Sequence, residues 1–164
     1  MDLQLKGKRA FISGSTKGIG RAIAQTLVEE GAEVIINGRT QKAIDETISD
    51  IKMEFPDAKI IGFPCDFTQP KTIDDLISTI GVVDILINNV GIFEPKEFLE
   101  ITDEDWQKFY TVNVLSGVKL SRAFLPHMLS QDWGRITCYL TWNCRDNQRN
   151  QCYCKFNTSR SNTF

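Results

Sequence analysis

The segment at residues 11–20 constrains the fold of this chain more than any other part of the sequence. Its glycines stand at positions 14, 18 and 20, in the spacing Gly-x-x-x-Gly-x-Gly, between an apolar run and an amphipathic one. Glycine permits a sharp turn from strand to helix and leaves room for a ligand against the backbone. The free N–H groups and the positive dipole end of the following helix favour an anion. The spacing therefore predicts a pyrophosphate-binding loop rather than a turn made only for geometry.

Strand and helix patterns alternate along the rest of the chain. Thr40 and Thr102 are each expected to cap a helix, because each hydroxyl precedes a segment with helical apolar spacing. Such alternation predicts an α/β fold, a Rossmann-like doubly wound parallel sheet that stops after about five strands. The expected strands are 8–13, 33–37, 59–63, 83–87 and one that begins at 134–136, and the expected helices are 17–30, 40–52, one from Pro70 and a long one at 102–129.

Composition places the chain among ordinary soluble proteins. The 164 residues are 41% hydrophobic and 24% charged, with a net charge of −2, which indicates one domain and gives no electrostatic footprint for nucleic acid. No apolar run is long enough to span a membrane, and residues 1–6 lack the pattern of a signal peptide. We therefore expect a cytoplasmic protein whose five cysteines are reduced thiols.

Four segments together resemble motifs of the short-chain dehydrogenase/reductase family. They are Ser-Gly-Ser-Thr-Lys-Gly-Ile-Gly at 13–20, Cys-Asp-Phe at 65–67, Asn-Asn-Val-Gly at 88–91 and Thr-Val-Asn-Val at 111–114. Their order and spacing also match, and the resemblance covers residues 6–136. Val90 stands where the family usually has alanine.

The resemblance implies a role for each motif. In the family, the glycine loop holds the pyrophosphate, Asp66 lies beside the adenine, and the segment 88–91 supports the central strand and the cofactor. Asn113 would belong to a catalytic tetrad, in which it helps to hold a proton-relay water. No metal ligand is implied. The candidate cofactor-binding residues are Gly14, Ser15, Thr16, Lys17, Gly18, Ile19, Gly20, Arg39, Asp66, Phe67, Asn88, Asn89 and Gly91.

The end of the second expected strand indicates which dinucleotide is preferred. Enzymes that use NAD usually carry an acid there, bonded to the ribose 2′-hydroxyl. This strand instead ends Asn-Gly-Arg-Thr at 37–40, without an acid. Arg39 and Lys17 would flank a 2′-phosphate, and the planar donors of arginine suit phosphate. We therefore expect NADP(H) to be favoured over NAD(H), although two solvated surface cations are the simpler alternative.

The expected catalytic partners of Asn113 are not found. The family uses a serine just past the fifth strand and a Tyr-x-x-x-Lys pair on the next helix. Tyr153 and Lys155 are two residues apart, which places them on different sides of a helix, and Thr141 stands near the expected serine. The tyrosines at 110, 139 and 153 are followed four residues later by Val114, Asn143 and Asn157.

The sequence after residue 136 has a different composition. Beyond Leu140 it contains no Ala, Val, Ile, Leu, Met, Gly or Pro, so we divide the chain into an NAD(P)-binding domain at 1–136 and an atypical, disordered or frame-shifted tail at 137–164. Three interpretations of this tail remain: a metal site at Cys144, Cys152 and Cys154, a regulatory or interaction tail, and a shifted reading frame or misread exon. We favour the third, because residues 137–144 back-translated and read one base later are compatible with Val-Ile-Ser-x-Gly-Ile-Ala, which resembles the family's strand and catalytic serine.

Two functions follow from these observations. By resemblance, the chain is an NADP(H)-dependent oxidoreductase that transfers hydride between a small carbonyl compound and an alcohol, but it is not expected to be competent as it stands. The alternative is a non-catalytic nucleotide-binding or dimerising fragment. The expected long helix carries Trp106, Phe109 and Tyr110 at helical spacing, which allows a homo-oligomer. Neither nucleic acid nor membrane is an expected partner.

Overall fold

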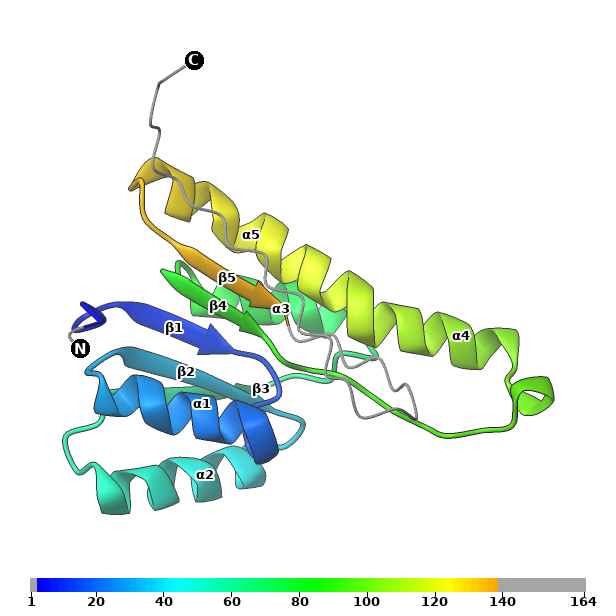
Figure 1. The fold of residues 1–164 in the computed structure, drawn as a ribbon, viewed down its shortest axis with the longest axis horizontal. Helices are drawn as coiled ribbons and strands as arrows, with labels where there is room; N and C mark the ends of the chain where they lie inside the picture. Colours follow the sequence, from blue (N-terminus) through cyan, green and yellow to red (C-terminus); the bar gives the residue numbers. More distant parts are fainter. Residues whose placement is uncertain (1–2, 139–164) are drawn as a thin grey trace.

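Five parallel strands in the order β3-β2-β1-β4-β5 form the centre of the molecule (Figure 1). The computed structural model describes residues 3–138. The register pairs Phe11 of β1 with Ile35 of β2 on one side and with Leu86 of β4 on the other. The predicted doubly wound sheet is therefore confirmed, with its change of direction between β1 and β4. The strands are β1 Arg9–Ile12, β2 Glu33–Gly38, β3 Ile60–Pro64, β4 Ile85–Asn88 and β5 Arg135–Cys138.

Helices cover both faces of this sheet. Helices α1 and α2 pack on one face, whereas α3 and α5 pack on the other (Figure 1). The α4 helix and the loop before it extend beyond the sheet. No helix formed by residues 3–138 is long and apolar enough to cross a membrane. The helices are α1 Gly18–Glu29, α2 Gln41–Glu54, α3 Pro70–Ile80, a 3-10 turn η1 Phe98–Glu100, α4 Asp103–Tyr110, a π-helical turn η2 Thr111–Leu115 and α5 Ser116–Ser130.

Alternation along the strands divides the core into two clusters. Ala10 and Ile12 of β1 point toward α1 and α2, whereas Phe11 between them points toward α3 and α5. The ring of Phe11 meets Phe124 of α5 edge to face, with centroids 6.2 Å apart. Because both faces are covered, β1 is apolar at three consecutive positions, Ala10 to Ile12, rather than at alternate ones.

Two threonines begin their helices as predicted. The Thr40 hydroxyl accepts a hydrogen bond from the N–H of Ala43 at the start of α2. Thr102 forms a capping box with Asp105, in which each side chain accepts a hydrogen bond from the other residue's backbone N–H. Each cap satisfies N–H groups that the first turn of a helix leaves without an intrahelical partner.

The predicted long helix from Thr102 is continuous to Ser130, but its middle turn differs from the expectation. Residues Thr111–Leu115 form a π-helical turn between α4 and α5, which accommodates one more residue per turn than an α-helix. The side chain of Asn113, in this turn, forms two hydrogen bonds with the backbone of Ile92. This tertiary contact accompanies the local change in helical pitch, and apolar periodicity alone does not reveal it.

Replacement of Phe124 by alanine tests the importance of the core beneath α5. Phe124 is 1% exposed and contacts Phe11 across the sheet face, so Phe124→Ala is expected to lower the free energy of unfolding by about 3–5 kcal/mol. Urea denaturation followed by circular dichroism measures the loss. Leu129→Ala on the same helix is the control, because Leu129 is 55% exposed. Equal losses in the two variants would contradict the described packing of α5.

Candidate functional site

A cleft of about 430 Å³ lies at the carboxyl ends of β1, β2, β3 and β4, where ligands bind in open α/β sheets. Its volume falls within the usual range for ligand pockets. The cleft brings together the glycine loop, the end of β2 and the segments that follow β3 and β4. The sequence-predicted residues that line it are Gly14, Thr16, Lys17, Arg39, Asp66, Phe67, Asn89 and Gly91, and those that do not are Ser15, Gly18, Ile19, Gly20, Asn88 and Asn113.

Each of the three positions in the loop requires glycine for a different structural reason. Gly14 has φ +63°, and a Cβ there would lie 3.1 Å from the Cα of Val90. Gly18 has φ +57°, which disfavours any residue with a side chain. At Gly20, a Cβ would collide with the amide nitrogen of Asn89 and the carbonyl of Gly14. The loop is therefore packed directly against the Asn-Asn-Val-Gly segment, and glycine is needed for that approach.

Ser13 joins these two segments and was not predicted as a site residue. Its buried hydroxyl accepts hydrogen bonds from the backbone N–H groups of Asn89 and Val90, both at 3.0 Å, and donates to the carbonyl of Ile87 at 3.4 Å. The Asn89 side chain donates in return to the carbonyls of Ser13 and Gly14. The only sequence signal was the hydroxyl residue directly before the first glycine.

Asn37 joins the glycine loop to β2 through hydrogen bonds, and it was not predicted as a site residue. Its side-chain oxygen accepts a hydrogen bond from the Gly14 N–H at 3.1 Å, and its amide nitrogen donates to the carbonyl of Phe63 at 2.9 Å. Its backbone N–H donates to the hydroxyl of Ser15, which donates in turn to the carbonyl of Ile12 at 2.7 Å. The hydroxyl of Ser15 is therefore bonded to β1 and β2, and Ser15 is fully buried.

Two cations lie at the β2 side of the cleft. Lys17 and Arg39 both line it. A Cβ at Gly38, between Asn37 and Arg39, would lie 2.5 Å from the Cγ2 of Thr16, so a side chain at this position would require Thr16 to move. The end of β2 therefore presents positive charge to the cleft and no carboxylate of its own.

The segment after β3 contributes a carboxylate and a thiol. Asp66 accepts hydrogen bonds from the backbone N–H of Thr68 at 2.9 Å and from its hydroxyl at 2.8 Å, and these contacts hold the pKa of Asp66 below its usual value. Arg39 lowers this pKa further. Burial raises the pKa of the neighbouring Cys65 thiol, which therefore stays protonated at neutral pH. Phe67 is buried and gives the cleft an apolar wall.

Asn88 and Asn113 lie behind the cleft. The amide nitrogen of Asn88 donates to Ser121 Oγ at 3.3 Å and contacts Cys138 Sγ at 3.4 Å, and its buried Oδ1 has no hydrogen-bond partner among residues 3–138. Asn113 Oδ1 accepts from the Ile92 N–H at 2.8 Å, and its Nδ2 donates to the Ile92 carbonyl at 3.0 Å. Asn113 therefore fixes the chain that leaves β4.

Several sequence predictions fall outside the described residues. They include the candidate catalytic positions Thr141, Tyr153 and Lys155, the three cysteines at 144, 152 and 154, and the tail from residue 139 onward. Residues 137 and 138, which the sequence analysis placed in the tail, belong to β5.

The donors around the cleft suit an extended, phosphorylated ligand. No side chain among residues 3–138 caps the N-terminus of helix α1, which leaves its first N–H groups available to an anion. Lys17 and Arg39 add charge on one side, and Asp66 with Phe67 offers a hydrogen-bond acceptor beside an apolar surface. Gly14 and Gly18 leave the loop without a side chain at these two positions. A dinucleotide fits this set of residues.

Replacement of Ser13 tests how the two cleft segments are joined. Ser13→Ala leaves the N–H groups of Asn89 and Val90 without their acceptor, and we expect it to lower the free energy of unfolding by about 1–3 kcal/mol. Ser13→Thr keeps the hydroxyl and is the matched variant. Chemical denaturation of both compares the losses. An alanine variant as stable as the threonine one would show that these bonds contribute little.

Comparisons with known proteins agree with the fold. The family model described as short chain dehydrogenase matches residues 8–152. The chain is 43% identical over 136 residues to the uncharacterized oxidoreductase YvaG of Bacillus subtilis, an alignment that covers 83% of this chain and 52% of the relative. It is 33% identical over 142 residues to the 3-oxoacyl-[acyl-carrier-protein] reductase FabG of Aquifex aeolicus, covering 83% and 56%.

A solved structure shows the same architecture. The L-sorbose reductase of Gluconobacter frateurii, crystallised with NADPH and L-sorbose, superposes with a TM-score of 0.78 at 31% identity, over 84% of this chain and 54% of that one. The chain thus spans about half the length of the relatives that it matches. With the parallel sheet, the glycine loop and the family match, the chain belongs to the short-chain dehydrogenase/reductase family.

Proposed function

We propose that this chain binds NADP(H) in the cleft, in preference to NAD(H). The observation that carries the proposal is the pairing of two cations, Lys17 and Arg39, with a β2 that ends at Gly38 and carries no acid there. A 2′-phosphate would find arginine donors there, whereas the 2′-hydroxyl of NAD(H) would find no carboxylate on β2. The L-sorbose reductase that resembles this chain was crystallised with NADPH, which supports the proposal.

The remaining cleft residues are assigned by position. The glycine loop from Gly14 to Gly20 would hold the pyrophosphate with backbone N–H groups, and Asp66 with Phe67 would border the adenine. Asn89 and Gly91 would support the opposite end of the dinucleotide. When bound, the nicotinamide gives or takes up the hydride of the family's reaction. Asn113 acts here by holding the Ile92 backbone in place.

We further propose that the 164-residue chain binds the dinucleotide without carbonyl or alcohol turnover. The family's reaction needs a tyrosine that exchanges a proton with the substrate oxygen and a lysine that lowers the pKa of that tyrosine. No tyrosine of this sequence is followed four residues later by lysine. Asn113 is thus the only tetrad member that the sequence supplies at a matching position. The substrate of a competent relative would be a small carbonyl compound or alcohol.

The alternative role as a dimerising fragment has one observation in its favour. Large apolar side chains spaced by four residues are exposed along the α4–η2–α5 helix, namely Trp106, Tyr110, Val114 and Val118. A continuous stripe of this kind gains free energy when it is covered, and a second copy of the chain would cover it symmetrically.

Substitution of Arg39 tests the cofactor preference. Arg39→Ala removes a charge-assisted contact to the 2′-phosphate, and we expect it to weaken NADPH binding roughly tenfold or more while NADH binding changes little. Fluorescence titration of the full chain with each dinucleotide measures both affinities. Arg122→Ala, an exposed arginine on α5, is the control. Equal weakening for NADPH and NADH would contradict the assignment of Arg39.

A turnover assay tests the absence of catalysis. We expect no oxidation of NADPH above background when the chain is incubated with aldehydes and ketones, because the Tyr-x-x-x-Lys pair is missing. Absorbance at the nicotinamide band follows the reaction. Hydride transfer that persists in Tyr153→Phe and Lys155→Ala variants would show that other residues of this chain perform the chemistry.

A further inference from the structure

A buried hydrogen bond joins helix α2 to the glycine loop. Thr47, in the middle of α2, is 3% exposed, and its hydroxyl donates to the carbonyl of Thr16 at 3.2 Å. Within residues 3–138, no other hydrogen bond joins the backbone of residues 16–19 to an element other than α1, which these residues enter. Helix α2 therefore holds the loop at the residue directly before Lys17.

The hydroxyl of Thr47 has two acceptors for its single proton. It lies 2.7 Å from the carbonyl of Ala43 in its own helix and 3.2 Å from that of Thr16. A threonine in a helix commonly bonds back to the residue four positions earlier, and Thr26 of α1 does only this, at 3.1 Å. Thr47 differs from Thr26 because its second acceptor belongs to a residue that lines the cleft.

Thr16 lies between the end of β2 and the middle of α2. Its methyl group is against Gly38, and its carbonyl meets Thr47. Lys17 follows Thr16 in the sequence and Arg39 follows Gly38, so both cations leave the backbone beside this contact. Both are exposed, both line the cleft, and neither forms an ion pair within residues 3–138.

The two cations repel each other when no anion lies between them. This repulsion favours movement of the loop away from the end of β2. The bond from Thr47 opposes that movement, because α2 begins directly after Thr40 and packs against β2 and β3. A phosphate gains most from donors that are already in position before it binds. The bond therefore prepares the β2 side of the cleft for an anion.

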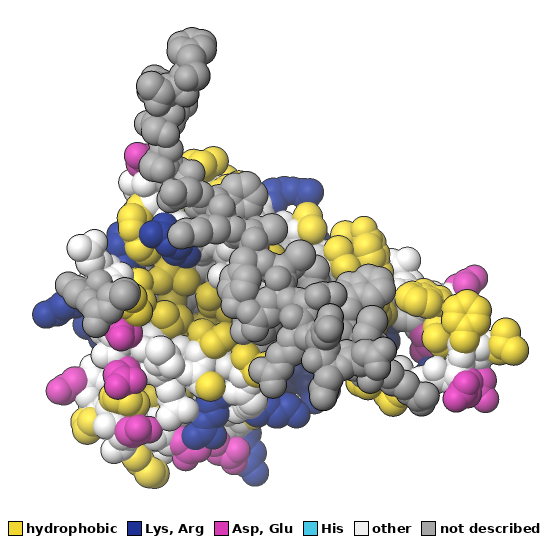
Figure 2. Space-filling model, viewed as in Figure 1, with side chains coloured by type: hydrophobic (Ala, Val, Ile, Leu, Met, Phe, Trp, Pro, Cys, Tyr) yellow, Lys and Arg dark blue, Asp and Glu magenta, His cyan; other side chains and the backbone are white. Residues whose placement is uncertain are grey.

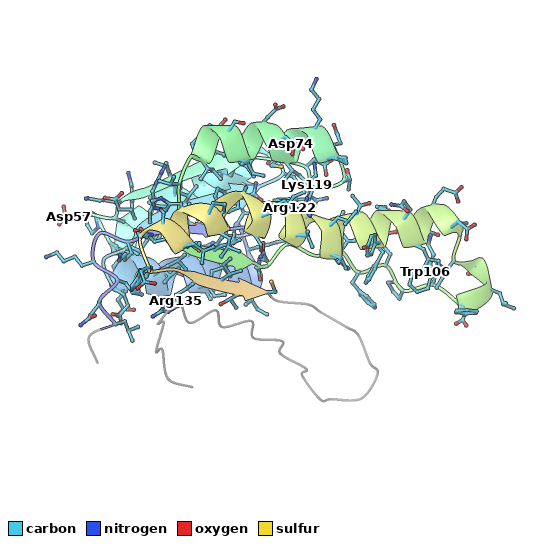
Figure 3. The ribbon with its side chains drawn as sticks, turned by 90° about the horizontal axis from the view of Figure 1, so that it is seen from above. Asp57, Asp74, Trp106, Lys119, Arg122 and Arg135 are labelled. Carbon is cyan, nitrogen blue, oxygen red and sulfur yellow. The ribbon has the colours of Figure 1, made fainter. Side chains whose placement is uncertain are left out.

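The other links between neighbouring helices are at the surface. Helices α1 and α2 lie side by side (Figure 1), charged side chains of both signs gather over them (Figure 2), and Arg21 lies 3.0 Å from Asp50 there. On the other face of the sheet, Lys119 of α5 lies 3.0 Å from Asp74 of α3 (Figure 3). Exposed ion pairs contribute little to stability, whereas the bond made by Thr47 is buried.

We propose that Thr47 is a positioning residue for cofactor selection. Its bond to the Thr16 carbonyl sets the separation of Lys17 and Arg39 and thereby strengthens binding of the 2′-phosphate. This inference rests on the preference for NADP(H) proposed above. Helix α1 is held by its own buried residues, Ala24 among them, so the pyrophosphate contacts that NADPH and NADH share depend less on Thr47.

Titration of two Thr47 variants tests this role. Thr47→Val removes the hydroxyl and keeps a side chain of similar shape, and we expect NADPH binding to weaken about three- to tenfold while NADH binding changes by less than about twofold. Thr47→Ser keeps the hydroxyl and should restore the preference. Fluorescence titration of the full chain measures each affinity. Thr26→Val is the matched control, because it removes a bond of the same kind that reaches no cleft residue.

A double variant separates positioning from general support of the loop. In an Arg39→Ala background, Thr47→Val should have little further effect on NADPH binding, because one of the two cations that it positions is already absent. Residues that act through the same contact are non-additive in this way, whereas independent effects add. Full additivity of the two substitutions would contradict the positioning role.

Three further results would overturn the proposal. The first is equal weakening of NADPH and NADH binding by Thr47→Val, since the threonine would then support the loop as a whole. The second is an unchanged affinity for NADPH in that variant, and the third is an equal loss of preference in Thr26→Val. If the unchanged chain itself binds NADPH no more tightly than NADH, the proposed preference fails and this inference fails with it. A preference that Thr47→Val retains overturns this inference alone.

Discussion

The hydroxyl of Ser13 connects the two loops on which the cleft depends. One loop leaves β1 and carries the glycines, and the other leaves β4 and carries the Asn-Asn-Val-Gly segment. A buried N–H group without an acceptor is costly, and Ser13 accepts from two of them at once. This contact holds the loops at the point where the sheet changes direction, and the side chains of Asn37 and Asn89 add to it.

The same segment links the cleft to the helices on the other face. Beyond Gly91 the chain reaches Ile92, whose backbone is bonded on both its N–H and its carbonyl by Asn113. Glu94, two residues later, pairs with Lys108 of α4. From Ser13 to Lys108, therefore, a series of polar contacts fixes the wall of the cleft that Ile92, Glu94 and Lys108 form.

The sequence predicted the elements whose cause is local. Thr40 and Thr102 were recognised as caps because hydroxyl capping involves residues only three positions apart, and the glycine spacing indicated the loop at 14–20. The parallel sheet followed from the alternation of strands and helices. For the candidate site, the prediction gave the segments that meet at the cleft, including Arg39 and Asp66.

The parts that were missed depend on residues far apart in the chain. Asn37 looked like an ordinary strand residue, but its side chain bonds to Gly14 and Phe63. Gly20 is required by Asn89, 69 positions later, and the π-helical turn accompanies a contact between Asn113 and Ile92. Periodicity and propensity describe neighbours along the chain, so they cannot report such contacts.

The π-helical turn at Thr111–Leu115 also sets the rotational phase between two helices. Each residue of an α-helix advances the side-chain direction by about 100°. A π-helical turn holds one extra residue at nearly the same phase, so loss of one residue within Thr111–Leu115 would restore regular α-helix and leave α5 close to its present rotation. Loss of one residue within α4 or α5 would instead rotate one helix relative to the other by that angle. Either Phe124 and Leu120 would leave the core or Trp106 would turn away from its loop. Within α4 and α5, insertions and deletions are therefore more disruptive than substitutions, whereas the π-helical turn between them is the place where loss of one residue preserves the phase.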